Sequence, residues 1–337
     1  MKEWLLEFLE CSKLEIRISK RDKYTGEPYS GVIRCGKKTY FIKRGIAILI
    51  DKSDLTRFSK LRGLYEALPE APWKASRNDW IRHMRILHLQ MMRDALLYFN
   101  MTSKKRINIL AVGCGWGWEL WALELFLKKL NFQGTYFFVG IDIANKPLRL
   151  ARRILIKSGF KHIDFAVCPA EKLPFKEKSF DIVTGIFGAF DHSEFYYKAF
   201  LEVSRILTDD GVFIFTALNK FALDWIIKVL KNPALYYKTI KKAKDPFVRI
   251  TIPLPKGGSV RIPTHYYNPL EIYRLMKLCG LKIIRKYGIF SILPMNFRRR
   301  EFTRQHIILS KMERCLSNCF PISILGRYMG VIAKKDL

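Results

Sequence analysis

Three glycines alternate with other residues in the stretch Gly113–Gly117, directly after the short apolar run Ile107–Val112. Closely spaced glycines between a strand and a helix bring bare backbone and free N–H groups to one place, where a ligand can approach closely. We therefore expect a small-molecule site at this loop.

The residues that follow the loop indicate which kind of ligand it serves. A nicotinamide-binding fingerprint would place its third glycine at position 118, where this chain has Trp118. A large indole there would block the close helix–strand contact that the glycine allows. Asp142 ends the next apolar run, where its carboxylate can accept hydrogen bonds from ribose hydroxyls or cap the following helix.

Candidate proton acceptors occur further along the chain. Asp191 and His192 lie just past the expected strand Phe180–Ile186, at the sheet edge where ligands bind in such folds. His192 is the better general base, because an imidazole titrates near neutral pH. A structural His–Asp pair is the alternative. His265, in an expected hairpin, is a second candidate base, with an ordinary surface position as the alternative.

Further motifs follow the glycine loop in order over about residues 105–217. Together they resemble the class I S-adenosylmethionine (SAM)-dependent methyltransferases, in the branch of the ubiquinone and menaquinone methylases. That family reads L-D-V-G-C-G-T-G, an acidic residue closing strand two, D-A-E-x-L-P-F, S-F-D-x-V and E-x-x-R-V-L-K-P-G-G. Besides Asp142, the matching segments are Ile109–Gly117, Ala170–Phe175, Ser179–Val183, Glu202–Leu207 and Asp209–Gly211.

The resemblance implies SAM as the cofactor and a role for each matching residue. The loop residues Gly113, Cys114, Gly115 and Gly117 would lie along its methionine part. Asp142 would bind the ribose, with Ile143 against the adenine. Ala170 would offer its backbone to the adenine edge beside Glu171, and Ile186 and Phe187 would flank the methyl-donor pocket.

Two positions depart from the family pattern. Ala111 stands where the family usually has an acidic residue near the amino group of SAM, and Pro169 stands where an aspartate usually contacts the adenine amino group. Losing both would weaken SAM binding by about 1–3 kcal/mol if the lost hydrogen bonds are ordinary ones. These departures motivate one alternative function, that of a non-catalytic methyltransferase-like binding protein.

The elements that must position these residues alternate between strands and helices. Expected strands at 107–112, 135–141, 162–168, 180–186 and 211–217 enclose helices at 118–130, 146–158 and 194–207. This alternation predicts an α/β fold: a Rossmann-like, seven-stranded, mostly parallel sheet with helices on both faces. We expect three parts: a β-rich unit over 1–55, a helical linker or lid over 56–104, and the methyltransferase domain over 105–337, in which the insertion 218–268 contains a hairpin and covers the substrate.

The N-terminal unit has a fainter resemblance, carried by Gly31–Cys35, Tyr40–Ile42 and Gly45–Leu49. These segments look like the end of a small zinc-ribbon domain that accompanies some tRNA and protein methyltransferases. The ribbon needs two C-x-x-C pairs, and only Cys11 and Cys35 remain. Two thiolates cannot complete a tetrahedral site, so we expect a ribbon-like fold without a metal.

Charge and cysteine usage limit the partners. Sixty Lys and Arg against thirty Asp and Glu give a net charge of +30, which attracts RNA, anionic membrane surfaces or phosphorylated substrates. Short basic clusters lie at 104–106, 238–244 and 298–300.

Seven cysteines in 337 residues do not form a disulfide framework and fit a reducing cytoplasm. The chain has no run of 18 or more uncharged apolar residues, so we expect no transmembrane helix.

The methyl acceptor is indicated by the segment that follows the fourth expected strand. This segment, Ile186–Phe190, is apolar and aromatic, which favours a small or lipophilic acceptor. The expected helix around Ile307–Leu316 is amphipathic and could touch an anionic membrane, with core packing as the alternative. An RNA methyltransferase is the competing enzyme hypothesis, motivated by the charge and the ribbon-like N-terminus. The oligomeric state is not predicted.

Overall fold

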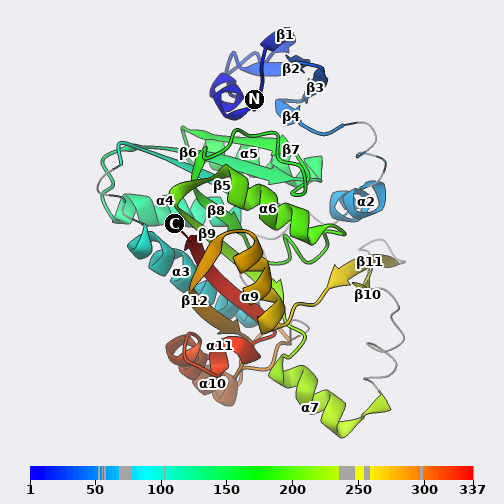
Figure 1. Ribbon diagram of the computed structural model, residues 1–337, viewed down its shortest axis with the longest axis vertical. Helices are drawn as coiled ribbons and strands as arrows, with labels where there is room; N and C mark the ends of the chain where they lie inside the picture. Colours follow the sequence, from blue (N-terminus) through cyan, green and yellow to red (C-terminus); the bar gives the residue numbers. More distant parts are fainter. Residues whose placement is uncertain are drawn as a thin grey trace.

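One mixed sheet forms the centre of the molecule. The computed structural model describes residues 1–51, 54, 56, 58–67, 78–99, 101, 104–234, 247–253, 259–296 and 299–336. Within these residues the sheet has eleven strands in the order β1-β2-β3-β4-β7-β6-β5-β8-β9-β13-β12 (Figure 1). The α/β class is as expected. Seven of the strands, β5 to β9 with β12 and β13, come from the expected methyltransferase domain, but a separate seven-stranded sheet is not confirmed, because the four N-terminal strands extend the same sheet.

Five parallel strands form the middle of this sheet. They are β7 (Ile163–Val167), β6 (Thr135–Asp142), β5 (Arg106–Val112), β8 (Phe180–Gly185) and β9 (Leu207–Leu218). The strands β13 (Tyr328–Lys335) and β12 (Leu281–Ile289) continue it in antiparallel pairings. The parallel strands bury most of their side chains, as strands covered on both faces do.

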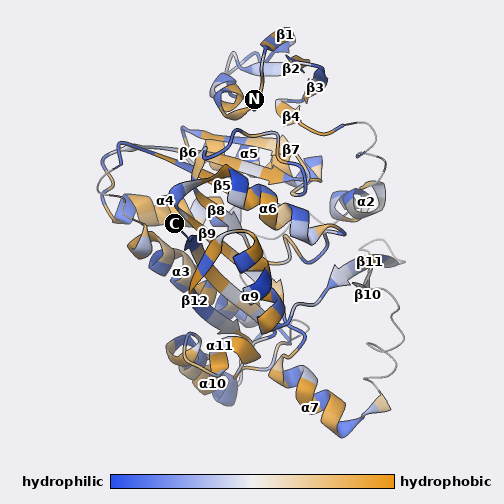
Figure 2. Ribbon diagram, viewed as in Figure 1, coloured by the Kyte–Doolittle hydropathy of each residue, from blue (hydrophilic) through white to orange (hydrophobic). Residues whose placement is uncertain are grey.

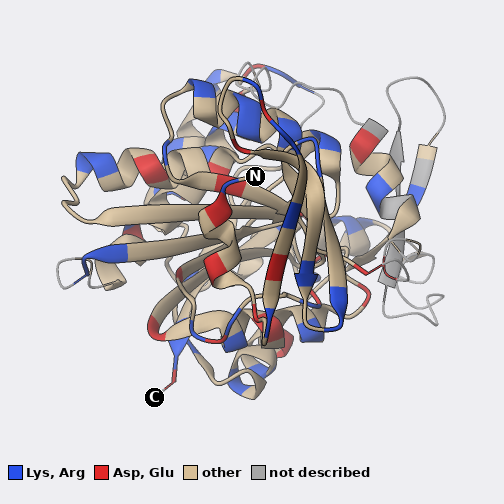
Figure 3. Ribbon diagram, turned by 90° about the horizontal axis from the view of Figure 1, so that it is seen from above, with Lys and Arg blue, Asp and Glu red and all other residues tan. Residues whose placement is uncertain are grey.

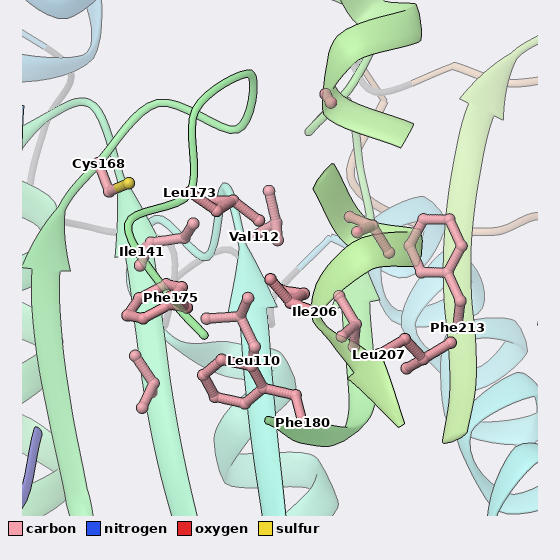
Figure 4. Packing of buried hydrophobic residues seen from close by; sticks show 14 of the residues in the cluster. Leu110, Val112, Ile141, Cys168, Leu173, Phe175, Phe180, Ile206, Leu207 and Phe213 are labelled. Atoms are coloured by element: carbon pink, nitrogen blue, oxygen red, sulfur yellow. The ribbon is translucent and has the colours of Figure 1, made fainter. Parts of the chain in front are cut away.

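Helices cover both faces of the parallel strands. On one face α3 (Asp79–Tyr98), α4 (Trp118–Lys129) and α5 (Asn145–Lys157) pack with Ile109 and Ala111. On the other face α6 (Tyr196–Ile206) and α9 (Pro269–Leu278) pack with Leu110 and Val112. Figure 4 shows these two side chains together with Ile206 of α6. Successive side chains of β5 thus enter opposite cores, because side chains alternate along a strand.

The four N-terminal strands are joined to the sheet edge. These are β1 (Leu14–Arg21), β2 (Pro28–Cys35), β3 (Lys38–Lys43) and β4 (Ile46–Ile48), and β4 pairs in parallel with β7 through Ala47 and Ala166. The short helix η1 (Glu3–Phe8) packs beneath them, with Phe8 stacked on Phe180 at 5.0 Å between ring centroids. These contacts bury the N-terminal residues in the same core as the strands and α6.

Cys11 and Cys35 meet in this N-terminal region. They form a disulfide with 5.1 Å between their Cα atoms, which is a single cross-link and not a disulfide framework. The other five cysteines are free thiols. Among the described residues, no group of three or more His, Cys, Asp and Glu side chains could hold a metal ion.

The remaining elements lie around the antiparallel end and the insertion. They are α2 (Ser59–Ala67), α7 (Leu223–Lys231), the hairpin β10 (Phe247–Pro253) and β11 (Ser259–His265), α10 (Arg304–Leu316) and α11 (Ile322–Leu325). The hairpin expected in the insertion is confirmed for its two strands, which form their own two-stranded sheet. The basic cluster at 238–244 lies outside the described residues.

Hydropathy and charge are distributed differently over these elements. Figure 2 shows the central strands as mostly hydrophobic, whereas the helices carry both hydrophobic and hydrophilic residues. Lys and Arg are spread over many elements in Figure 3 and are not gathered on one of them. Within the described part of the chain, no helix is long and apolar enough to cross a membrane.

Candidate active site

A cavity of about 590 Å³ opens where the central parallel strands end. Its walls are the loops after β5, β6, β7 and β8, together with residues from α2, α3 and α4. The volume falls within the roughly 300–1,000 Å³ that small-molecule sites occupy. Of the twelve site residues expected from the sequence, eleven line this cavity: Gly113, Cys114, Gly115, Asp142, Ile143, Ala170, Glu171, Ile186, Phe187, Asp191 and His192.

The glycine loop has the left-handed backbone that its composition predicts. Gly113, Gly115 and Gly117 have φ values of 63°, 49° and 74°. A Cβ on Gly113 would lie 2.9 Å from the Cβ of Ala189, so the loop after β8 packs directly on this glycine. A Cβ on Gly115 would meet nothing within 4 Å. The open space beside Gly115 is therefore what lets a ligand contact the loop backbone.

Gly117 has a different role from the other two glycines. It precedes α4 and does not line the cavity. A Cβ there would lie 3.0 Å from Cδ1 of Leu155 and 3.3 Å from Cβ of Ala151, both on α5. Gly117 thus allows the close packing of the loop on α5, so its expected contact with the cofactor is not supported by its position.

Asp142 joins the loops that follow β5 and β6. Its Oδ2 accepts a hydrogen bond from the N–H of Gly115 at 3.0 Å, and its Oδ1 accepts one from the N–H of Ala144 at 2.9 Å. Burial raises the pKa of Asp142 to about 6 although these N–H groups act in the opposite direction. Each carboxylate oxygen can accept more than one hydrogen bond, so ribose hydroxyls can still bind here.

The loops after β7 and β8 form the facing wall. Glu171 is held in place by the Ser193 hydroxyl, which donates to its Oε1 at 2.7 Å. Phe187 has a φ of 58° and is 52% exposed, and its N–H donates to Thr216 Oγ1 at 2.7 Å. This strained backbone turns an aromatic ring out over the cavity. Pro169 does not line this cavity.

Asp191 is buried at the end of this wall. Its Oδ1 accepts a hydrogen bond from the N–H of Leu218 at 3.1 Å, and its Oδ2 has no hydrogen-bond partner in the described structure. Burial raises the pKa of Asp191 to about 8. At neutral pH the carboxyl is therefore mostly protonated, and it can donate a hydrogen bond to a group in the cavity.

His192 lies beside Asp191 but does not form a His–Asp pair with it. Its Nδ1 lies 3.3 Å from the carbonyl oxygen of Pro263 and 3.1 Å from Thr264 Oγ1. A Cβ added to Gly188 would lie 3.6 Å from both His192 Nε2 and Asp191 Oδ2, so both atoms approach the same point. Burial lowers the pKa of His192. The imidazole is therefore neutral at pH 7, and when Nδ1–H donates to Pro263, Nε2 is free to accept a proton.

His265, the second candidate base, does not line the cavity. Its Nε2 lies 2.5 Å from Glu271 Oε1, and its ring stacks on Tyr196 with 4.3 Å between centroids. Its backbone N–H donates to the carbonyl oxygen of Asp191 at 2.7 Å. His265 is thus neither a surface residue nor a cavity base, and it supports the loop that carries Asp191.

Several cavity residues were not expected from the sequence. Tyr65 comes from α2, Arg85 and His88 come from α3, and Glu119 comes from the first turn of α4. Burial lowers the pKa of His88 to about 3, which makes it a neutral wall residue. The buried apolar residues of α3 recur at helical spacing, and one of them, Met84, also lines the cavity; they are Trp80, Met84, Leu87, Met91 and Leu96.

The fold and the site together match a known class of protein. The sequence profile of a family described as a methyltransferase domain matches residues 103–277. The chain belongs to this methyltransferase-domain family, and its cofactor is SAM. The cavity fits such a cofactor, because a glycine loop with open space, a strand-end carboxylate and buried acidic side chains meet in it.

The chain is also similar to individual proteins. An uncharacterised protein of Methanocaldococcus jannaschii is 27% identical over 277 residues, which is 82% of this chain and 90% of that protein. A ubiquinone biosynthesis O-methyltransferase of Pasteurella multocida is 22% identical over 191 residues, covering 54% of this chain and 70% of that enzyme. A SAM-dependent methyltransferase structure from Methanosarcina mazei has 20% identity and a TM-score of 0.46, covering 69% of this chain and 94% of that one.

Proposed function

We propose that this protein transfers the methyl group of SAM to a hydroxyl group of a small or lipophilic acceptor. One observation carries the proposal: His192 Nε2 and Asp191 Oδ2 approach the same point beside Gly188, in a cavity with apolar and aromatic walls. The kinship with a ubiquinone biosynthesis O-methyltransferase supports a lipophilic acceptor and an oxygen nucleophile. Membership of the quinone-methylase branch is part of this proposal.

The residues of the site have separate proposed roles in the reaction. When bound, SAM would supply a methyl group from its sulfonium. The sulfur would keep the electron pair of the broken carbon–sulfur bond. His192 Nε2 accepts the proton that the acceptor hydroxyl loses as its oxygen bonds to the methyl carbon. The protonated carboxyl of Asp191 donates a hydrogen bond that orients the acceptor. Phe187 and Ile186 exclude water from the transfer.

The surrounding parts of the chain have proposed roles as well. The residue contacts expected for SAM, with Asp142 at the ribose and Ile143 and Ala170 at the adenine, belong to this proposal. So does the division into an N-terminal unit (1–55), a helical linker or lid (56–104) and a methyltransferase domain (105–337). The insertion 218–268 would cover the acceptor, since Pro263 and Thr264 already contact His192. We place the protein in the cytoplasm, with peripheral contact to anionic membranes as a further part of the proposal.

The test is methyl transfer from radiolabelled SAM to fractionated lipid, small-molecule and RNA extracts. We expect the label in a lipid or small-molecule fraction. His192→Ala should lower kcat by about 10²–10⁴-fold and leave S-adenosylhomocysteine affinity within about twofold, because a base acts on the acceptor. Burial of His192 should also place the acidic limb of the kcat profile below the usual histidine range.

Three results would contradict the proposal. Full activity of His192→Ala would exclude the imidazole as the base. Label found only in RNA, with binding that weakens steeply as salt rises, would favour the RNA methyltransferase, for which the net charge of +30 is the supporting observation. Absence of transfer to any fraction despite SAM binding would favour a non-catalytic role.

A further inference from the structure

We propose that Glu119 binds the α-ammonium group of the methionine part of SAM, through a carboxylate supplied by α4 and not by β5. Nothing in the glycine-loop motif assigns a role to this residue. The inference concerns cofactor binding and does not depend on which acceptor receives the methyl group.

The first support for this assignment is the position of Glu119 in the fold. It stands in the first turn of α4, two residues after Gly117, and lines the cavity together with Gly113 and Gly115. Its side chain is only 5% exposed. Helix α4 packs on the face of the sheet to which Ala111 points. A long side chain from the helix can therefore reach the end of β5 from beside the strand.

The hydrogen bonding of Glu119 fixes where its carboxyl group lies. Thr184 is fully buried and donates its hydroxyl to Glu119 Oε1 at 3.1 Å. Thr184 of β8 is the direct strand partner of Ala111 of β5. Side chains of paired residues on parallel strands point to the same face. The carboxyl of Glu119 thus lies beside Thr184, the strand partner of Ala111, at a place where Ala111 offers no side-chain oxygen.

The charge balance around Glu119 points to a cationic ligand. Among the described residues, Glu119 forms no ion pair, whereas Glu124 on the same helix pairs with Lys128 at 2.7 Å. Burial raises the pKa of Glu119 to about 8. A buried carboxylate without a cation is costly, and a bound cation removes that cost.

SAM carries two cationic groups, the sulfonium and the α-ammonium, and their chemistry decides which of them can pair with Glu119. The sulfonium has no N–H to donate and must face the acceptor. The α-ammonium has three donors, and a carboxylate is the natural partner for them. Glu119 Oε1 is already bonded to Thr184, which leaves the remaining acceptor positions of the carboxylate for the ammonium.

The experiment compares two ligands that differ only in this amino group. Calorimetry would measure S-adenosylhomocysteine and its desamino analogue binding to the wild type, Glu119→Gln and Glu124→Gln. Glu119→Gln keeps an oxygen for the Thr184 hydroxyl. It should weaken S-adenosylhomocysteine about 10–100-fold, as loss of a charged hydrogen bond does, and leave the desamino analogue within about twofold. Glu124→Gln, which lies on the same helix but outside the cavity lining, should bind both ligands as the wild type does.

A second readout is proton release on binding. At pH 6.5 Glu119 is mostly protonated in the free protein. Pairing with the ammonium should ionise it, so S-adenosylhomocysteine should release more protons from the wild type than from Glu119→Gln, measured in buffers of different ionisation enthalpy. Equal weakening of both ligands, or equal proton release, would overturn the proposal. If Glu119→Gln does not fold, Thr184→Val should show the same selective loss, to a smaller degree.

Discussion

Three titratable side chains in the cavity have pKa values displaced by the same cause. Burial raises the pKa of Glu119 and Asp191 to about 8 and lowers the pKa of His192. At neutral pH these three groups are therefore mostly neutral, and each can gain a charge, the carboxyl groups by ionising beside a cation and the imidazole by taking up a proton. Such opposed shifts are typical of sites where binding and proton transfer are coupled.

Asp142 provides a test of cofactor binding at the level of one residue. Asp142→Ala should weaken S-adenosylhomocysteine about 10–100-fold, since it removes charged hydrogen bonds to the ribose. Calorimetry measures this directly. Asp142→Asn is the matched control for the loop, because its amide oxygen can still accept from the N–H of Gly115. Unchanged affinity in Asp142→Ala would show that the ribose binds elsewhere.

Helices α3 and α10 are held together by one buried polar cluster. Glu313 of α10 is fully buried, and its Oε2 lies 2.7 Å from Nε2 of His83 on α3. Its Oε1 accepts hydrogen bonds from the N–H groups of Ser291 and Ile292, in the segment after β12. A single carboxyl group therefore joins α10 to the segment after β12 and to α3, whose His83 lies 230 residues earlier in the sequence.

Removing this carboxyl should loosen the antiparallel end of the molecule. Glu313→Ala leaves buried donors without partners, and we expect it to lower the free energy of unfolding by ~3 kcal/mol in urea titrations. Lys311→Ala, an exposed change on the same helix, should stay within about 0.5 kcal/mol of the wild type. Equal effects of both substitutions would mean that the cluster does not stabilise the fold.

The sequence predicted the central strands and helices well. It did not predict that the N-terminal strands pair with the edge of the central sheet. The expected helix at 118–130 is α4 (Trp118–Lys129), and α9 begins with a capping box in which Asn268 is the N-cap and Pro269 follows it. Apolar periodicity and capping are local signals, so they can be read along the chain. The pairing of β4 with β7 depends on two edges meeting in space, and no local pattern encodes it.

The site was predictable where a motif had a fixed spacing. Eleven of the residues expected between Gly113 and His192 line the cavity, because loops after parallel strands meet at one edge of the sheet. Glu119 was not found, because an acidic residue in the first turn of a helix ordinarily serves the helix dipole. Only its burial and its contact with Thr184 show that it belongs to the cavity.

The stability of the whole molecule should depend on pH through the buried carboxyl groups. Glu119 and Asp191 hold their protons up to about pH 8 in the folded state, whereas in the unfolded chain they lose them near pH 4. The folded state thus binds more protons between these values, so their contribution to stability falls as pH rises from about 4 to 8 and then levels off.

Urea midpoints at pH 5, 6.5 and 8 without ligand would measure this dependence. Relative to the wild type, Glu119→Gln and Asp191→Asn should gain stability as pH rises, because an amide never ionises. A difference between each variant and the wild type that stays constant with pH would show that the carboxyl ionises as readily in the folded protein as in the unfolded chain.

The junction between β4 and β7 has a consequence for how the protein is made. A ribosome completes Ala47 long before it completes Ala166, its partner across the junction. During translation the edge of β4 therefore has no partner strand until β7 has been made. An unpaired strand edge is a template for pairing with other chains. We expect the nascent N-terminal segment to be a binding site for chaperones until β7 has emerged and covered that edge.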